Sequence, residues 1–94
     1  MLSERAILIV EADIHLGKFL KRQLALNKYS VDVTTDGKNA GVELSGNHHD
    51  LVILALNLPG MDGMDLLKKI RLTQPRLPIL VLSARNRTED IVHS

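Results

Sequence analysis

Four short apolar runs recur along the chain, and segments with a helical pattern of apolar positions separate them. Three of these runs, Ala6 to Val10, Leu51 to Leu56 and Ile79 to Ser83, contain almost no polar side chains. This is typical of parallel strands that are covered on both faces. The remaining run, Val31 to Thr34, alternates apolar and polar residues, which favours a strand at the edge of a sheet. The pattern predicts four strands.

Helical spacing of apolar residues predicts three helices between these strands. The first covers residues 14 to 27, with Leu16, Phe19, Leu20 and Leu24 as its inward positions. The second covers residues 38 to 45 and is weaker, because Gly41 lowers its helix propensity; its apolar members are Ala40, Val42 and Leu44. The third ends before Pro75, and its inward residues are Leu66, Leu67 and Ile70. A further helix is expected to start within residues 88 to 93.

Strands and helices alternate with short connections, which implies a doubly wound parallel sheet of the α/β class, because parallel strands need crossover connections of one hand. The fourth strand is as apolar as the first and third, which implies neighbours on both sides, yet no strand follows it in the sequence. An apolar edge of this kind is open to association. We therefore expect a single domain over residues 1–94, truncated after its fourth strand, that forms a homodimer or exchanges segments between copies.

Composition narrows the classes of function. The chain has 94 residues, a net charge of +1 and no cluster of basic residues, which argues against direct binding of nucleic acid or an anionic membrane. It has no cysteine, which excludes disulfides and thiolate chemistry. The first apolar run is too short for a signal peptide or a membrane span. We expect a cytoplasmic location and no membrane partner.

Oxygen-bearing residues follow the predicted strands at the edge where open α/β sheets bind their ligands. Glu11 and Asp13 follow the first strand, Asn57 follows the third, and Ser83 ends the fourth. Such oxygens are the ligands that Mg²⁺ prefers. For Asp13, capping of the next helix is favoured over metal binding. The tip of the third strand is Ala55, which offers no reactive group.

Other candidate sites are weaker. His48 and His49 lie in a polar loop with no third ligand in view, so a metal site there is not expected. Asp62 is expected to organise the loop after the third strand and the start of the next helix. The loop after the first strand has no glycines and carries carboxylates, which argues against binding of a nucleotide pyrophosphate.

Four segments in order carry a resemblance to a known family. They are Ile7-Leu8-Ile9-Val10-Glu11, Asp50-Leu51-Val52-Ile53-Leu54, Asn57-Leu58-Pro59-Gly60-Met61-Asp62-Gly63 and Leu77-Pro78-Ile79-Leu80-Val81-Leu82-Ser83-Ala84. This pattern resembles the receiver domain of two-component response regulators, especially those of transcription factors. The resemblance implies a flavodoxin-like fold and a role in a phosphorelay rather than an enzyme's role.

In that family an aspartate at the tip of the third strand accepts a phosphoryl group from a sensor histidine kinase, and the domain then switches an output domain. Two acidic residues after the first strand hold Mg²⁺ with that aspartate and a backbone carbonyl. The resemblance assigns Glu11 to the first acidic position, the Asn57 backbone to the carbonyl ligand and Ser83 to the switch hydroxyl. Contact with DNA would then occur only through a C-terminal output domain that these residues do not include.

The sequence departs from the family pattern in three places. Ala55 occupies the phosphoacceptor position, Ala12 occupies the second acidic position, and the expected lysine, fifth strand and fifth helix are absent from these residues. We therefore expect no phosphotransfer and weak or absent Mg²⁺ binding.

Two explanations of the alanines remain open. The chain is either a natural receiver-like interaction module that works without phosphorylation, or a working receiver altered at positions 12 and 55. Persistence of family residues around the site favours the second; they are Glu11, Asn57, Pro59, Asp62, Gly63 and Ser83.

Overall fold

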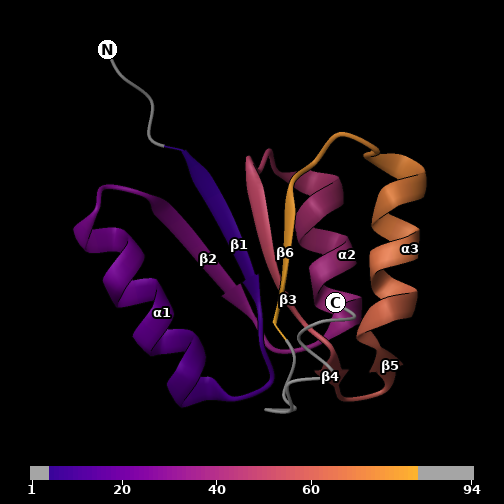
Figure 1. Cartoon of the computed structure of the whole chain (residues 1–94), viewed down its shortest axis with the longest axis horizontal. Helices are drawn as coiled ribbons and strands as arrows, with labels where there is room; N and C mark the ends of the chain where they lie inside the picture. Colours follow the sequence, from indigo (N-terminus) through magenta and orange to yellow (C-terminus); the bar gives the residue numbers. More distant parts are fainter. Residues whose placement is uncertain (1–4, 83–94) are drawn as a thin grey trace, which may run out of the picture.

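The computed structural model describes residues 5 to 82. Its main sheet holds four parallel strands in the order β2-β1-β3-β6. These strands are β1 (Ala6–Val10), β2 (Ser30–Thr34), β3 (Leu51–Ala55) and β6 (Ile79–Leu82). The helices are α1 (Ile14–Leu26), α2 (Gly37–Gly46) and α3 (Gly63–Thr73). Helix α1 covers one face of the sheet, and α2 and α3 cover the other (Figure 1). The predicted doubly wound α/β fold is confirmed, with β2 at an edge. The helix expected within residues 88 to 93 lies outside the described residues.

The larger core lies between the sheet and the helix pair α2 and α3. Leu8, Val52 and Leu54 of the two central strands are completely buried there. Leu66 and Ile70 supply the inward stripe of α3, as the sequence predicted. In α2, one of the three predicted apolar members, Val42, is 64% exposed. Only Ala40 and Leu44 face the sheet, because they lie four residues apart on one side of the helix.

The smaller core lies under α1, and the predicted inward stripe of this helix is partly wrong. Leu20 and Leu24 pack on the sheet, but Phe19 is 57% exposed and Leu16 is 39% exposed. The third inward position is Gly17, where an added Cβ would lie 3.0 Å from a Val33 methyl group. A close approach of the backbone thus replaces a side chain at that turn of the helix. Helical spacing alone could not reveal this, because Phe19 fits the stripe equally well.

A small antiparallel hairpin, absent from the sequence prediction, follows β3. It consists of β4 (Asn57–Leu58) and β5 (Met61–Asp62). Gly60 turns the chain with a φ of +74°, a conformation that glycine adopts without steric cost. Asp62 then caps α3, because its Oδ1 accepts the Met64 N–H at 2.9 Å. The predicted role of Asp62 as organiser of the loop and the next helix is confirmed.

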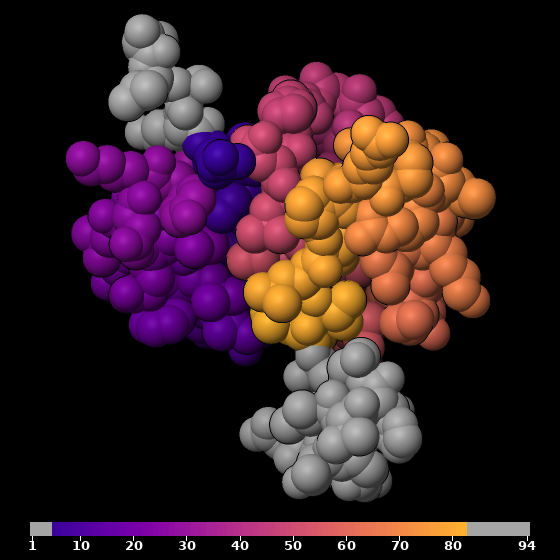
Figure 2. Space-filling view, turned by 45° about the horizontal axis from the view of Figure 1, so that its top comes forward, coloured from indigo at the N-terminus to yellow at the C-terminus, as the bar shows by residue number. Residues whose placement is uncertain are grey.

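Strand β6 forms the second edge of the sheet as far as residues 5–82 show, because it pairs only with β3. It lies at the molecular surface beside α3 in the space-filling view (Figure 2). Leu80 is aligned with Ile53 of the α1-side core and is 53% exposed. The sequence expected this strand to be buried on both sides, and its partial exposure comes from this edge position. None of the helices within residues 5–82 has the length and apolar character needed to cross a lipid bilayer.

Asp50 ties the start of β3 to the start of β1. Its Oδ2 accepts the Ala6 N–H at 2.7 Å, while its own N–H donates to the Ala6 carbonyl at 2.7 Å. Its Oδ1 lies 2.9 Å from His48 Nε2. The hydrogen bond from Ala6, followed by that from His48, holds the pKa of the Asp50 carboxyl below its ordinary value of 3.8.

This lowered pKa predicts a loss of stability in acid. A depressed folded-state pKa stabilises the fold above the unfolded pKa, and this stabilisation disappears as pH falls through the folded value. The melting temperature should therefore decrease more steeply below pH 3.8 in the unaltered chain than in Asp50→Asn. Thermal unfolding followed by circular dichroism from about pH 6 to about pH 2.5 measures this. Parallel curves for the two proteins would contradict the role of Asp50.

Candidate functional site

The carboxyl ends of β1 and β3 form the candidate site. Val10 and Leu54 are aligned in the sheet, so the next residues along these strands, Glu11 and Ala55, come to the same edge. Glu11 is buried, its N–H donates to the Thr34 carbonyl at 3.0 Å, and its carboxylate accepts the Asp13 N–H just beyond the end of β1. The structure brings these two predicted site positions together.

Asp13 is the N-cap residue of helix α1. Its Oδ1 accepts the N–H groups of His15 and Leu16 at 2.9 and 3.1 Å, which satisfies two free donors of the first turn. The Asp13 N–H in turn donates to Glu11 Oε2 at 2.9 Å. The predicted role of Asp13 as the N-cap of α1 is confirmed, while its part in metal binding stays a prediction.

Ala55 is the last residue of β3 and is 6% exposed. The chain leaves the sheet immediately after it, since the Leu56 N–H donates to the Leu82 carbonyl at 3.2 Å. The Gly63 N–H returns to the Leu56 carbonyl at 3.0 Å and brings the start of α3 against this tip. The most enclosed position of the site therefore holds a methyl group.

The remaining predicted residues lie around this tip. Asn57 is exposed and begins β4, where it is aligned with Asp62 of β5. Ala12 is exposed and has no side-chain oxygen. Ser83, the expected switch hydroxyl, lies outside the described residues, so its place relative to Ala55 stays a prediction.

The donor set at this edge does not fit a Mg²⁺ site. Mg²⁺ requires near-octahedral oxygen ligands and is usually held by one or two carboxylates. Among the described residues at this edge, Glu11 already accepts the Asp13 N–H with one of its two oxygens. Positions 12 and 55, where the family has carboxylate ligands, are both alanine. Asp13 is engaged as a helix cap. We therefore derive no chemical step through a metal ion at this site.

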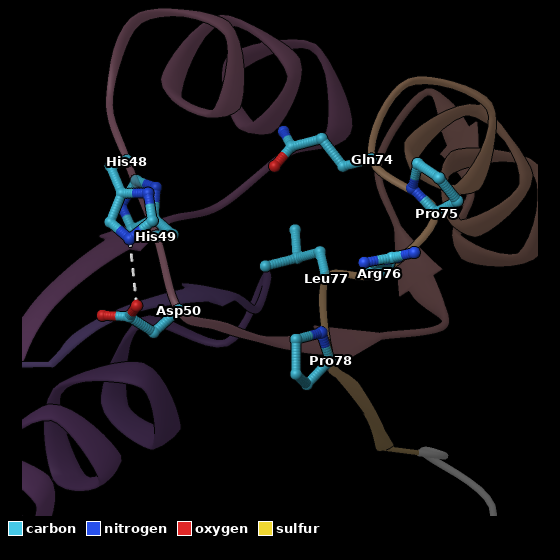
Figure 3. Close-up of a pocket in the computed structure, with 8 residues that line it drawn as sticks. All are labelled: His48, His49, Asp50, Gln74, Pro75, Arg76, Leu77 and Pro78. Atoms are coloured by element: carbon cyan, nitrogen blue, oxygen red, sulfur yellow. Dashed lines mark hydrogen bonds and ion pairs between the residues drawn. The ribbon is translucent and has the colours of Figure 1, made fainter.

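A pocket of about 400 Å³ lies at the opposite, amino end of the strands. Figure 3 shows its lining residues, with the His48 to Asp50 contact on one side and the Leu77-Pro78 segment that leads into β6 on the other. The pocket also holds His49, whose side chain is 1% exposed. Sequence reasoning did not find this pocket, because its sides come from two loops that only the fold brings together.

Comparison with known proteins agrees with this geometry. The family described as response regulator receiver domain matches residues 7–94. The transcriptional regulatory protein QseB of Escherichia coli O157:H7 is 41% identical over 86 residues, which cover 92% of this chain and 39% of QseB. The response regulator ArlR of Staphylococcus aureus strain Mu50 is 37% identical, covering 92% of this chain and 39% of ArlR. The chain thus spans about two fifths of the length of these curated relatives.

Solved structures show the same relationship. The non-phosphorylated HemR receiver domain from Leptospira biflexa has a TM-score of 0.85 and 34% identity, covering 96% of this chain and 73% of that one. The response regulator TrrA from Thermotoga maritima, solved in complex with Mg²⁺ and BeF, has a TM-score of 0.83 and 28% identity, covering 87% and 71%. The predicted flavodoxin-like receiver fold is therefore confirmed. This chain belongs to the response regulator receiver domain family.

Proposed function

We propose that this chain is a receiver domain of the two-component signalling type that engages protein partners without accepting a phosphoryl group. The observation that carries the proposal is Ala55, an enclosed methyl group at the tip of β3. The surrounding geometry supports a receiver scaffold, since the Glu11 carboxylate stays at the strand tips and Gly63 holds α3 against them. Such a domain is not an enzyme and acts by binding other proteins through its surface.

The proposed partners follow from membership in the receiver domain family. A sensor histidine kinase would dock on the receiver scaffold, and any contact with DNA would pass through an output domain joined to it. Resemblance to transcriptional regulators such as QseB supports the second point. We also assign the domain, 1–94, to the cytoplasm.

The loss of the phosphorylation site predicts a weak response to Mg²⁺. Positions 12 and 55 are alanine, and within residues 5–82 Glu11 is the one carboxylate at the ends of β1 and β3 that does not cap a helix. Addition of Mg²⁺ at about 10 mM should therefore change the melting temperature by less than about 1 °C, because a ligand that does not bind the folded state does not stabilise it. The matched variant Ala12→Asp with Ala55→Asp should gain a clear increase. An increase of several degrees in the unaltered chain would contradict the proposal.

We also propose that the chain self-associates, because within residues 5–82 strand β6 pairs on one side only. Leu80 presents an apolar side chain, 53% exposed, on the α1 side of the sheet. Burial of such a patch between two copies would remove apolar surface from water. Leu80→Lys should weaken dimerisation by about tenfold or more, as removal of a central interface contact does. Leu72→Lys on α3 is the control, since Leu72 is 84% exposed on another element.

Light scattering coupled to size-exclusion chromatography at several concentrations measures this effect. We expect a dimer for the unaltered chain and for Leu72→Lys, and a monomer for Leu80→Lys. A monomer for the unaltered chain at the highest concentration would rule out this association.

A further inference from the structure

Three metal-ligating side chains meet away from the strand tips. They are Asp32 of β2, Glu43 of α2 and His49 of the loop before β3, and one ligand atom from each lies within 4.8 Å of the others. Asp32 is aligned with Leu8 in the middle of β1, and His49 lies two residues before β3 begins. The cluster is therefore on the α2 side of the sheet and set back from the edge that holds Glu11 and Ala55.

His49 is the buried member of this cluster. Its side chain is 1% exposed, and its Nε2 lies 3.1 Å from Asp32 Oδ2. Its Nδ1 has no hydrogen-bond partner among the described residues. A carboxylate only accepts, so the neutral ring carries its proton on Nε2 and leaves a bare lone pair on Nδ1. The nitrogen that this ring offers to the cluster is therefore Nε2, which faces Asp32.

The two carboxylates remain accessible from outside. The Asp32 side chain is 57% exposed, and Glu43 is partly exposed. His49 also lines the pocket at the amino end of the strands (Figure 3). An ion could therefore reach the cluster from solvent, while the imidazole that receives it is held rigidly by burial.

We propose that Asp32, Glu43 and His49 form a binding site for a first-row divalent cation, with Zn²⁺ as the preferred ion. One imidazole nitrogen and two carboxylate oxygens, with water in the fourth position, make a four-coordinate Zn²⁺ site. The separation of 3.1 Å between His49 Nε2 and Asp32 Oδ2 fits neighbouring ligands that each lie about 2.1 Å from one ion. The imidazole ligand disfavours Mg²⁺ and Ca²⁺, which select oxygen.

Metal binding requires a change of tautomer at His49. The ion takes the Nε2 lone pair, so the Nε2 proton leaves to solvent and Nδ1 accepts a proton from solvent, with no net release from the ring. The two carboxylates balance the charge of the divalent ion. The proton on His49 should therefore move from Nε2 to Nδ1 when the ion binds, whereas a purely structural hydrogen bond to Asp32 would keep it on Nε2.

The test is a calorimetric titration of the 94-residue chain with ZnCl₂, alongside long-range ¹H–¹⁵N NMR of the imidazole rings. We expect one saturable site per chain, unaffected by excess Mg²⁺, with a change of the protonated His49 nitrogen from Nε2 to Nδ1. Glu43→Gln keeps the size of a partly exposed side chain and should weaken affinity about tenfold or more. His48→Gln, at the exposed neighbouring histidine, should leave affinity unchanged.

Each of the following outcomes would overturn the site. They are an absence of saturable Zn²⁺ binding, equal affinity in Glu43→Gln and the unaltered chain, and a His49 ring that keeps its tautomer on saturation. Loss of binding in His48→Gln with retention in Glu43→Gln would likewise assign the ion to surface histidines. Because Glu43→Gln and His48→Gln leave the buried ring in place, both variants test binding in a folded chain.

Discussion

Treatment of the chain with a small phosphodonor and Mg²⁺ should leave its intact mass unchanged. An acyl phosphate forms only on a carboxylate oxygen, and the tip of β3 presents the Ala55 methyl group instead. An alternative nucleophile at this edge, Glu11, is buried and accepts the Asp13 N–H. A carboxylate held in this way is poorly placed to replace the missing one. We therefore expect mass spectrometry to detect no phosphorylated species of the unaltered chain.

The matched control restores the missing carboxylates in the same scaffold. Ala12→Asp combined with Ala55→Asp should yield an added phosphoryl group that is labile in base. Ala12→Asp alone should remain unlabelled, because it supplies a metal ligand without a nucleophile. Detection of one phosphoryl group on the unaltered chain would contradict the assignment of Ala55 as the lost acceptor.

The fold followed from the sequence wherever local pattern and tertiary environment agree. Unbroken aliphatic runs located β1 and β3, because buried parallel strands have no wet face to alternate toward. The alternation in β2 correctly placed it at an edge. In α1 the pattern was ambiguous, since the inward position is Gly17 and the apolar Phe19 is largely exposed. The close approach of the α1 backbone to the sheet at Gly17 cannot be predicted from the spacing of hydrophobic residues.

The candidate site was predictable in part for a related reason. Strand ends meet at one edge in any parallel sheet, so the approach of Glu11 to Ala55 followed from the order of elements. The cluster of Asp32, Glu43 and His49 could not be predicted from the sequence. His49 lies 17 positions after Asp32, and only the register of β2 against β1 and of β1 against β3 brings the two residues together. The two-residue strands β4 and β5 are likewise too short for any periodic signal.

Gly63 should be the least replaceable glycine in this chain. A Cβ added there would lie 2.5 Å from Leu56 Cα and 2.6 Å from the Ala55 carbonyl oxygen. Both are backbone atoms of the chain leaving β3, so no side-chain rotation relieves the contact. The Gly63 N–H also donates to the Leu56 carbonyl at 3.0 Å, and displacement would weaken that bond. Gly63→Ala should lower the free energy of unfolding by about 3 kcal/mol, at the upper end for overpacking.

Gly41→Ala is the matched control, because a Cβ at Gly41, inside α2, meets nothing within 4 Å. Alanine is the better helix former, so this change should raise the free energy of unfolding by about 0.5–1 kcal/mol. Urea unfolding followed by circular dichroism measures both variants. Equal stability of Gly63→Ala and Gly41→Ala would mean that the loop after β3 yields freely, and Gly63 would then not be what holds α3 against the strand tip at Ala55. A lower free energy of unfolding in Gly63→Ala together with a higher one in Gly41→Ala would show that the packing of α3 against the tip of β3 requires the absence of a side chain at Gly63.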